Sequence, residues 1–150
     1  MPNTYTNLLY HIVFSTKHRA SLITDSLQDE LYKYIGGIIR EHGGTLLEIG
    51  GMPDHVHLVV RFKADKPISH LMQLIKGNSS KWVTEQKKQT VRFSWQEGYA
   101  AFSVSESQLP AVLKYVSNQE EHHRKTSFRD EFLALLRKHA IKYDERYILD

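Results

Sequence analysis

The sequence contains no cysteine among its 150 residues. Disulfide bonds, thiolate metal sites and cysteine nucleophiles are therefore excluded. The sequence also has no apolar run of membrane-spanning length and no P-loop pattern, and its first ten residues lack the charged and apolar regions of a signal peptide. From these absences we expect a cytoplasmic protein that does not cross a membrane and does not use a P-loop to bind ATP.

The length and composition favour one folded unit. With 150 residues, 41% of them hydrophobic, the chain can bury a core but is short for two domains, so we expect a single domain over residues 1–150. The net charge of +3 and the pI near 9.0 permit nucleic-acid binding without requiring it. Local basic clusters supply the candidate DNA contacts, although a solvated surface explains such charges equally well. The candidates are Lys17, Arg19, Lys76, Lys81 and Arg124.

His55 and His57 are the most informative residues of the chain. They are separated by Val56 on an expected strand, His55–Phe62. Alternate residues of a strand point to the same face, so both imidazoles lie on one side. Neutral imidazole nitrogens bind divalent transition ions, and the pair is therefore half of a candidate metal site. The pair alone also fits surface or core histidines, so a further ligand is needed.

Tyr115 and Gln119 lie in an expected helix over residues 110–123. Their spacing of four places them on one face, one turn apart. Gln119 falls in a stripe that should be buried, where an unpaired amide costs about 1–3 kcal/mol. A metal ion would satisfy its carbonyl oxygen. Without the histidines, a core tyrosine beside an amide at the wet edge of the stripe is the simpler interpretation.

Three strings taken together resemble the IS200-like transposases, the single-tyrosine HUH enzymes that include the REP-associated relatives. They are GGMPDHVHL at residues 50–58, WQEGY at residues 95–99, and YVSNQ at residues 115–119 followed by His122 and His123. The similarity covers nearly the whole chain in the expected order. It implies a transposase that cleaves and rejoins single-stranded DNA at hairpin-flanked sites. It also implies a homodimer, in which Tyr115 and its helix can complete the partner's site.

The resemblance also implies chemical roles for the candidate residues. His55, His57 and Gln119 would bind Mg²⁺ or Mn²⁺, whose open positions polarise and orient a phosphodiester. Tyr115 would attack phosphorus, release a 3′-hydroxyl and become joined to the 5′-phosphate. A phenol, with a pKa near ~10, leaves more easily than an alcohol, so a second 3′-hydroxyl can reseal the strand. Asp54, which neighbours His55, should point to the opposite face and is not expected to be a ligand.

The order of expected elements predicts an α+β fold. We expect strands over Leu8–Ser15, residues 45–49, His55–Phe62, residues 92–95 and residues 99–104, with helices beginning near Asp25, after Pro67, at residue 110 and at Ser127. The second and third strands would pair across a turn at residues 50–54. Weakly helical residues 77–80 favour a kink in the second helix. This order predicts a ferredoxin-like or RRM-like split βαβ sandwich, an antiparallel sheet covered by helices.

Three other functions remain open. A non-catalytic module could stack single-stranded nucleic acid on sheet aromatics, although the usual aromatic and glycine motif is absent. A hydrolytic metallonuclease would use the same ion to activate water and would need no positioned tyrosine. A metal or ligand sensor would use His55 and His57 without nucleic acid. Covalent capture of DNA distinguishes the transposase from all three.

Overall fold

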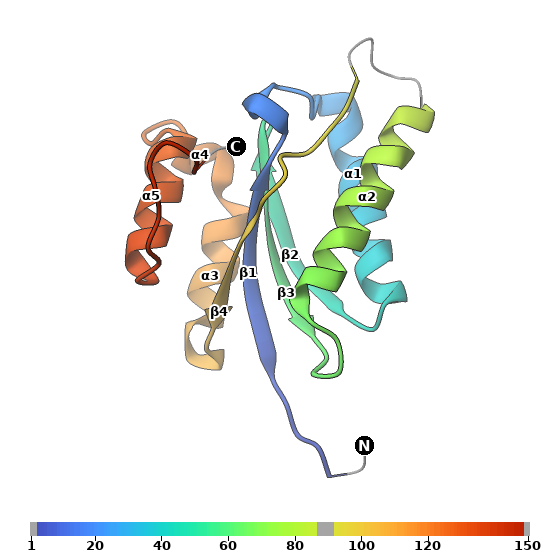
Figure 1. The fold of residues 1–150 in the computed structure, drawn as a ribbon, viewed down its shortest axis with the longest axis vertical. Helices are drawn as coiled ribbons and strands as arrows, with labels where there is room; N and C mark the ends of the chain where they lie inside the picture. Colours follow the sequence, from blue (N-terminus) through green and yellow to red (C-terminus); the bar gives the residue numbers. More distant parts are fainter. Residues whose placement is uncertain (1–2, 87–91, 149–150) are drawn as a thin grey trace.

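A four-stranded antiparallel sheet forms the centre of the computed structural model, which describes residues 3–86 and 92–148 (Figure 1). The strands are β1 (Leu8–Ser15), β2 (Thr45–Met52), β3 (His55–Phe62) and β4 (Ala100–Val104), in the spatial order β2-β3-β1-β4. β1 lies inside the sheet and pairs antiparallel with both β3 and β4. This arrangement confirms the predicted α+β fold with a split βαβ sheet.

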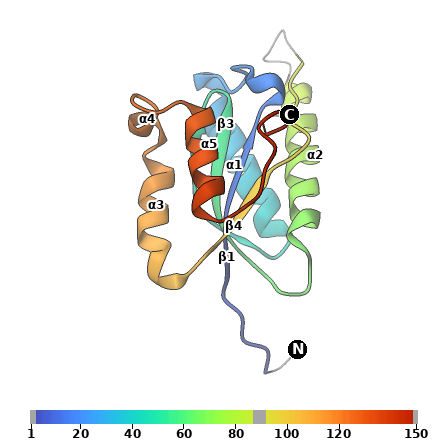
Figure 2. The same cartoon turned by 60° about the vertical axis from the view of Figure 1, so that its left-hand side comes forward.

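Helices cover both faces of the sheet (Figures 1 and 2). On one face lie α1 (Asp25–Glu41) and α2 (Ile68–Gln86); on the other lie α3 (Leu109–Ser117), α4 (Gln119–His122) and α5 (Phe128–Lys138). Short 3₁₀ turns, η1 (Lys17–Arg19) and η2 (Glu106–Gln108), follow β1 and β4. Among the described residues, no helix combines the length and the apolar character needed to cross a bilayer.

Alternation along β1 and β3 divides their side chains between two buried layers. Val56, Leu58 and Val60 point into the larger apolar core beneath α1 and α2, as predicted. The intervening residues of β3, His55, His57 and Val59, are also fully buried, because α3, α4 and α5 cover their face. A second apolar cluster on that side contains Phe102 of β4 with Phe128, Phe132 and Leu136 of α5. The histidines therefore lie inside the protein.

The hairpin of β2 and β3 is longer than predicted. β2 continues through Gly50 and Gly51 to Met52, which pairs with His55, so the turn is confined to Pro53 and Asp54. The predicted strand at residues 92–95 is wrong. In that segment only Trp95 forms an isolated bridge, opposite Thr16. The Trp95 indole packs against Phe14 and donates to Ser79, so its burial and not a strand ladder explains the apolar pattern there. Residues 87–91 lie outside the described residues.

The helices also differ in part from the predictions. The helix expected over residues 110–123 is two helices, because Asn118 adopts φ −108° and ψ 29° between α3 and α4. Asn favours such breaks because its side chain competes for backbone hydrogen bonds. The kink expected at residues 77–80 does not interrupt α2. The capping box that opens α5 is confirmed, since the Ser127 hydroxyl accepts the Asp130 amide at 3.1 Å.

Gly50 allows α3 to approach β2 closely. A Cβ at this position would collide with the carbonyl oxygen of Val116, the residue after Tyr115. By contrast, a Cβ added at Gly77 in α2 would meet nothing within 4 Å. The distance between α3, which contains Tyr115, and β2, which pairs with the histidine strand β3, therefore depends on the absence of a side chain at Gly50.

We expect Gly50→Ala to lower the free energy of unfolding by about 1–3 kcal/mol, the usual cost of overpacking. Gly77→Ala is the matched control and should be neutral or stabilising by up to about 1 kcal/mol, since Gly disfavours helix interiors. Urea unfolding followed by circular dichroism measures both. Equal stability of wild type and Gly50→Ala would contradict the close approach of α3 and β2.

Candidate metal and tyrosine site

The site begins with two imidazoles on β3. His55 pairs with Ser15 at the end of β1 and His57 pairs with Val13, which places both near one end of the two central strands. Both side chains are 0% exposed, and their ring centroids are 5.2 Å apart. Their shared face is as predicted.

Each imidazole is held through its Nδ1 atom. His55 Nδ1 lies 2.7 Å from Asp54 Oδ1, and His57 Nδ1 lies 2.8 Å from Nε2 of His11 on β1. Burial, with the nearby His57, lowers the pKa of His11 to about 3, so His11 is neutral and can accept the N–H of His57. Both Nε2 atoms are thereby left to face the site. Asp54 therefore holds the outer nitrogen of His55, a role that was not predicted from the sequence.

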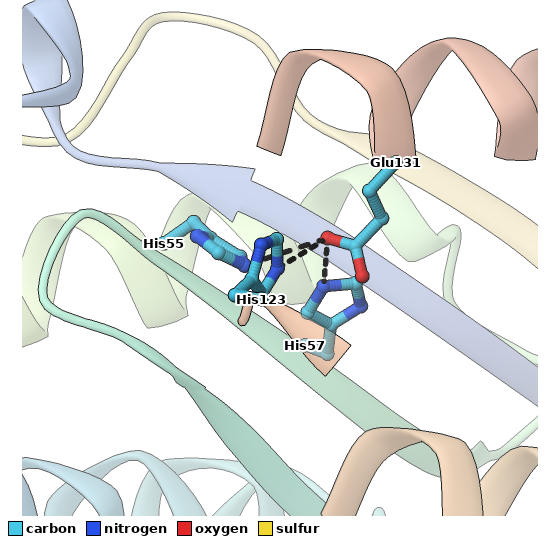
Figure 3. Close-up of side chains that lie close together, drawn as sticks. All are labelled: His55, His57, His123 and Glu131. Atoms are coloured by element: carbon cyan, nitrogen blue, oxygen red, sulfur yellow. Dashed lines mark hydrogen bonds and ion pairs between the residues drawn. The ribbon is translucent and has the colours of Figure 1, made fainter. Parts of the chain in front are cut away.

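A carboxylate from α5 lies where these nitrogens converge (Figure 3). Glu131 Oε1 is 2.9 Å from His57 Nε2, 3.1 Å from His123 Nε2 and 3.5 Å from His55 Nε2. Glu131 is only 2% exposed. Burial opposes its charge, but hydrogen bonds with His55 and His57 outweigh burial and hold the pKa of Glu131 well below its usual range. The cluster therefore contains a buried, charged carboxylate.

Tyr115 meets the same carboxylate from the other side. Its hydroxyl donates to Oε2 of Glu131, and its ring centroid is 5.7 Å from that of His57. His122 Nε2 lies 3.2 Å from the same Oε2 atom. Burial, followed by the hydrogen bond to Glu131 and the charge of that carboxylate, raises the pKa of Tyr115 above its usual value, so the phenol is neutral in this arrangement.

Gln119 completes the set of residues predicted from the sequence. It is 1% exposed, and its Oε1 lies 3.0 Å from His123 Nε2 and 3.3 Å from His55 Nε2. Its amide nitrogen donates to the Tyr115 carbonyl at 3.4 Å across the helix break. His55, His57, Tyr115 and Gln119, which come from two separate parts of the sequence, are therefore close neighbours.

Sequence reasoning assigned no role to Glu131, His123 or His11. A signal existed for Glu131, which lies three residues after Phe128 and four before Leu135 and thus on the apolar side of its helix. His11 likewise lies on the same strand face as the buried residues Leu9 and Val13 of β1. A charged or polar residue on a buried stripe requires a partner, and here each finds one in the histidine cluster.

The donors fit a divalent cation. One ligand atom each from His55, His57, His123 and Glu131 lie within 4.8 Å of one another. The Gln119 carbonyl oxygen lies beside them. Three imidazoles with carboxylate and amide oxygens suit first-row ions such as Mn²⁺. Beside the cluster, a cavity of about 760 Å³ is lined by Tyr115, Glu131 and residues of β4, α3 and α5.

The predicted DNA contacts are distributed around the molecule. Lys17 and Arg19 are exposed in η1, directly after the end of β1 that pairs with His55. Arg124 is exposed next to His123 and forms an ion pair with Glu121 at 3.3 Å. These cations lie at the end of the sheet that contains the site.

The two lysines of α2 lie on the other layer. Lys76 Nζ donates to the carbonyl oxygens of Glu97 and Gly98 at 2.8 and 3.0 Å, so it connects α2 to the segment before β4. Burial lowers the pKa of Lys76. Lys81 is exposed, but α2 covers the sheet face opposite the histidines. The structure does not bring these two residues to the site.

Comparison with known proteins identifies the family. The family model described as "Transposase IS200 like" matches residues 4–119. The chain belongs to the IS200-like transposase family. This confirms the resemblance in the sequence and supports a DNA-cleaving activity. The matched residues include β1 to α3 and end at Gln119, before α5 begins.

Individual IS200-like relatives agree with this assignment. The chain is 24% identical over 119 residues to the ISDra2 transposase TnpA of Deinococcus radiodurans, covering 76% of this chain and 85% of the relative. It is 27% identical over 130 residues to the transposase for insertion sequence element IS200 of Salmonella typhimurium, covering 81% and 82%. Both matches span most of each protein.

Solved structures match the fold. A putative transposase from Deinococcus radiodurans has a TM-score of 0.65 and 26% identity, covering 79% of this chain and 95% of that one. A REP-associated tyrosine transposase bound to a REP hairpin has a TM-score of 0.58, covering 77% and 68%. At 13% identity, the second likeness concerns the fold alone.

We expect Asp54→Ala to weaken Mn²⁺ binding by roughly 10- to 100-fold, the usual effect of removing a group that orients a metal-binding imidazole. The Asp54 side chain is 26% exposed, so the fold should tolerate its loss. Asp65→Ala, which removes an exposed carboxylate elsewhere, is the control. Calorimetric titration with Mn²⁺ measures both variants, and unchanged affinity in Asp54→Ala would refute its orienting role.

Proposed function

We propose that this IS200-like protein is a transposase that cleaves and rejoins single-stranded DNA at hairpin-flanked sites through a 5′-phosphotyrosine intermediate. One observation carries the proposal. The Tyr115 hydroxyl and the His57 Nε2 atom bind the two oxygens of one carboxylate, Glu131. The candidate nucleophile and the candidate metal site therefore contact the same carboxylate. The proposed enzyme is a single domain that acts in the cytoplasm.

His55, His57 and Gln119 are the proposed ligands of a divalent ion, Mg²⁺ or Mn²⁺. When bound, such an ion polarises and orients a phosphodiester. The contribution of the protein is to hold the ligands before the substrate arrives. Asp54 and His11 hold the imidazoles through their Nδ1 atoms, and the hydrogen bond from Gln119 to the Tyr115 carbonyl connects the amide ligand to the tyrosine helix.

Tyr115 performs the proposed covalent step. As its oxygen bonds to phosphorus, the phenol gives its proton to Glu131 Oε2, the oxygen that accepts its hydrogen bond. The bond from phosphorus to the 3′-oxygen breaks, and that oxygen takes up a proton and leaves as a 3′-hydroxyl. The phosphodiester is retained as a phosphotyrosine, so a second 3′-hydroxyl can reseal the strand without ATP. The cavity lined by Tyr115 and Glu131 gives the substrate room beside the phenol.

Hairpin DNA is the proposed partner, by analogy with the structural neighbour that is bound to a REP hairpin. Lys17, Arg19 and Arg124, which are exposed, are the cations proposed to hold its phosphates. The proposed enzyme is a homodimer. In the described chain Tyr115 contacts its own Glu131 and His57, so sharing of sites would require α3 to exchange between subunits.

Tyr115→Phe tests the nucleophile, because it removes the hydroxyl and retains the ring. The variant should bind Mn²⁺ and DNA like wild type but lose cleavage and the covalent adduct together. Tyr143→Phe is the control and should retain both. Labelled single-stranded hairpin DNA is incubated with Mn²⁺ and each protein, and the products are resolved on a denaturing gel.

Other outcomes of this experiment separate the remaining functions. An adduct in Tyr115→Phe would identify another tyrosine. Cleavage by wild type without an adduct would indicate a water-activating nuclease, and reversible binding without cleavage would indicate a binding module. Each of these results would contradict the proposed mechanism.

Salt dependence tests the phosphate contacts. Replacing Lys17 and Arg19 together by Ala should weaken hairpin binding and make the log–log salt slope shallower by roughly 0.7 for each phosphate that the variant no longer neutralises. Lys33→Ala removes an exposed charge from α1, on the other layer, and should leave the slope unchanged. Fluorescence anisotropy at several salt concentrations provides the slopes. A double variant that keeps the wild-type slope would exclude η1 from the DNA interface.

A further inference from the structure

Glu131 was not among the ligands predicted from the sequence, yet several imidazole nitrogens face one of its oxygens. Nε2 atoms of three histidines, His55, His57 and His123, lie between 2.9 and 3.5 Å from Oε1 (Figure 3). The Glu131 side chain is only 1% exposed, and that of His123 is 7% exposed. Imidazole nitrogens that converge in a dry site are an arrangement that a cation stabilises.

The position of Glu131 follows from the packing of α5. The helix begins at Phe128, whose ring stacks on His55 with a centroid separation of 4.1 Å. Glu131 lies three residues later, on the same helix face, and therefore points at the histidines. The Ser127 cap holds the start of this helix. The carboxylate is thus placed by a local contact with one of the proposed ligands.

His123 is placed independently of Glu131. It follows α4, and its Nδ1 lies 2.7 Å from the Thr126 carbonyl oxygen. An Nδ1–H that donates to this carbonyl leaves Nε2 as a lone-pair donor toward the cluster. All three imidazoles therefore have the same organisation, with Nδ1 bound to an outer partner and Nε2 facing inward.

We propose that His123 and Glu131 are ligands of the same ion as His55 and His57, and that this set of three imidazoles and a carboxylate selects a first-row transition ion over Mg²⁺. The proposal rests on the metal site of the proposed function and extends it to α5. Gln119 remains an oxygen donor within reach. Mg²⁺ prefers oxygen ligands and retains its waters, whereas imidazole suits Mn²⁺ and the later ions of the row.

Glu131 would then connect the ion to the nucleophile. Its Oε1 faces the imidazoles, and its Oε2 accepts the Tyr115 hydroxyl. A carboxylate that binds the ion through one oxygen keeps the other for the phenol. The proposed ligand therefore also sets the position of Tyr115 relative to the ion.

The decisive experiment is X-ray absorption spectroscopy of the full-length protein loaded with Mn²⁺ in the absence of DNA. Multiple scattering from imidazole rings counts the histidine ligands. We expect three imidazoles in wild type and two in His123→Gln. His122→Gln is the matched control, because His122 faces the other oxygen of Glu131, and it should retain three. Two imidazoles in wild type would overturn the proposal.

Metal titration tests the carboxylate. Glu131→Gln should weaken Mn²⁺ binding by roughly tenfold or more, at least the effect of losing an outer partner, while Glu121→Gln, an exposed carboxylate change, should not alter it. Mg²⁺ should fail to displace Mn²⁺ from wild type at equal concentration in an electron paramagnetic resonance titration. Unchanged Mn²⁺ affinity in Glu131→Gln, or ready displacement by Mg²⁺, would contradict the proposal.

These measurements are independent of the reaction. They use no DNA, and the count of imidazoles in wild type does not depend on whether a variant folds. If the ion has three imidazole ligands but the protein forms no DNA adduct, this inference is supported and the proposed function is refuted. A DNA adduct formed by a protein whose ion has only two imidazole ligands would support the proposed function and refute this inference.

Discussion

The carboxylate of Glu131 holds together the parts of the protein on which the site depends. It contacts His57 on β3, His123 after α4 and Tyr115 on α3, while its own helix, α5, packs over the sheet. A buried charge is costly unless it is paired and hydrogen-bonded, so these contacts must form together. The tyrosine, the histidines and α5 are consequently positioned by one shared requirement, the compensation of a single buried charge.

One face of the sheet carries the main apolar core, and the other carries the histidine cluster. Beneath α1 and α2, β1 and β3 contribute an uninterrupted apolar layer that includes Ile12, Phe14 and Leu58. On the other face, the alternate residues of the same strands include His11 and His57, so the polar cluster is built on strands whose opposite side chains are already fixed in the core. Such support keeps ligand positions rigid, which a metal site requires.

Local patterns in the sequence predicted the residues whose relation is set by one element or one turn. The period of a strand placed His55 with His57, and the turn of a helix placed Tyr115 near Gln119. The break at Asn118 and the roles of Glu131 and His123 depend on packing between helices that are distant from β3 in the sequence. A charge on the apolar side of α5 signals a partner, but no local rule identifies which one.

The match to the family model ends at Gln119, and α5, which follows it in the sequence, packs over the site. A helix that packs over the histidines must leave the phenol accessible, and the cavity beside Tyr115 provides that access. It is bounded by α3, β4 and α5, with Lys138, His122 and His139 on its wall. The wall beside the phenol therefore contains a cation and hydrogen-bonding side chains. The same helix, α5, therefore supplies the buried carboxylate and one wall of the cavity beside the phenol.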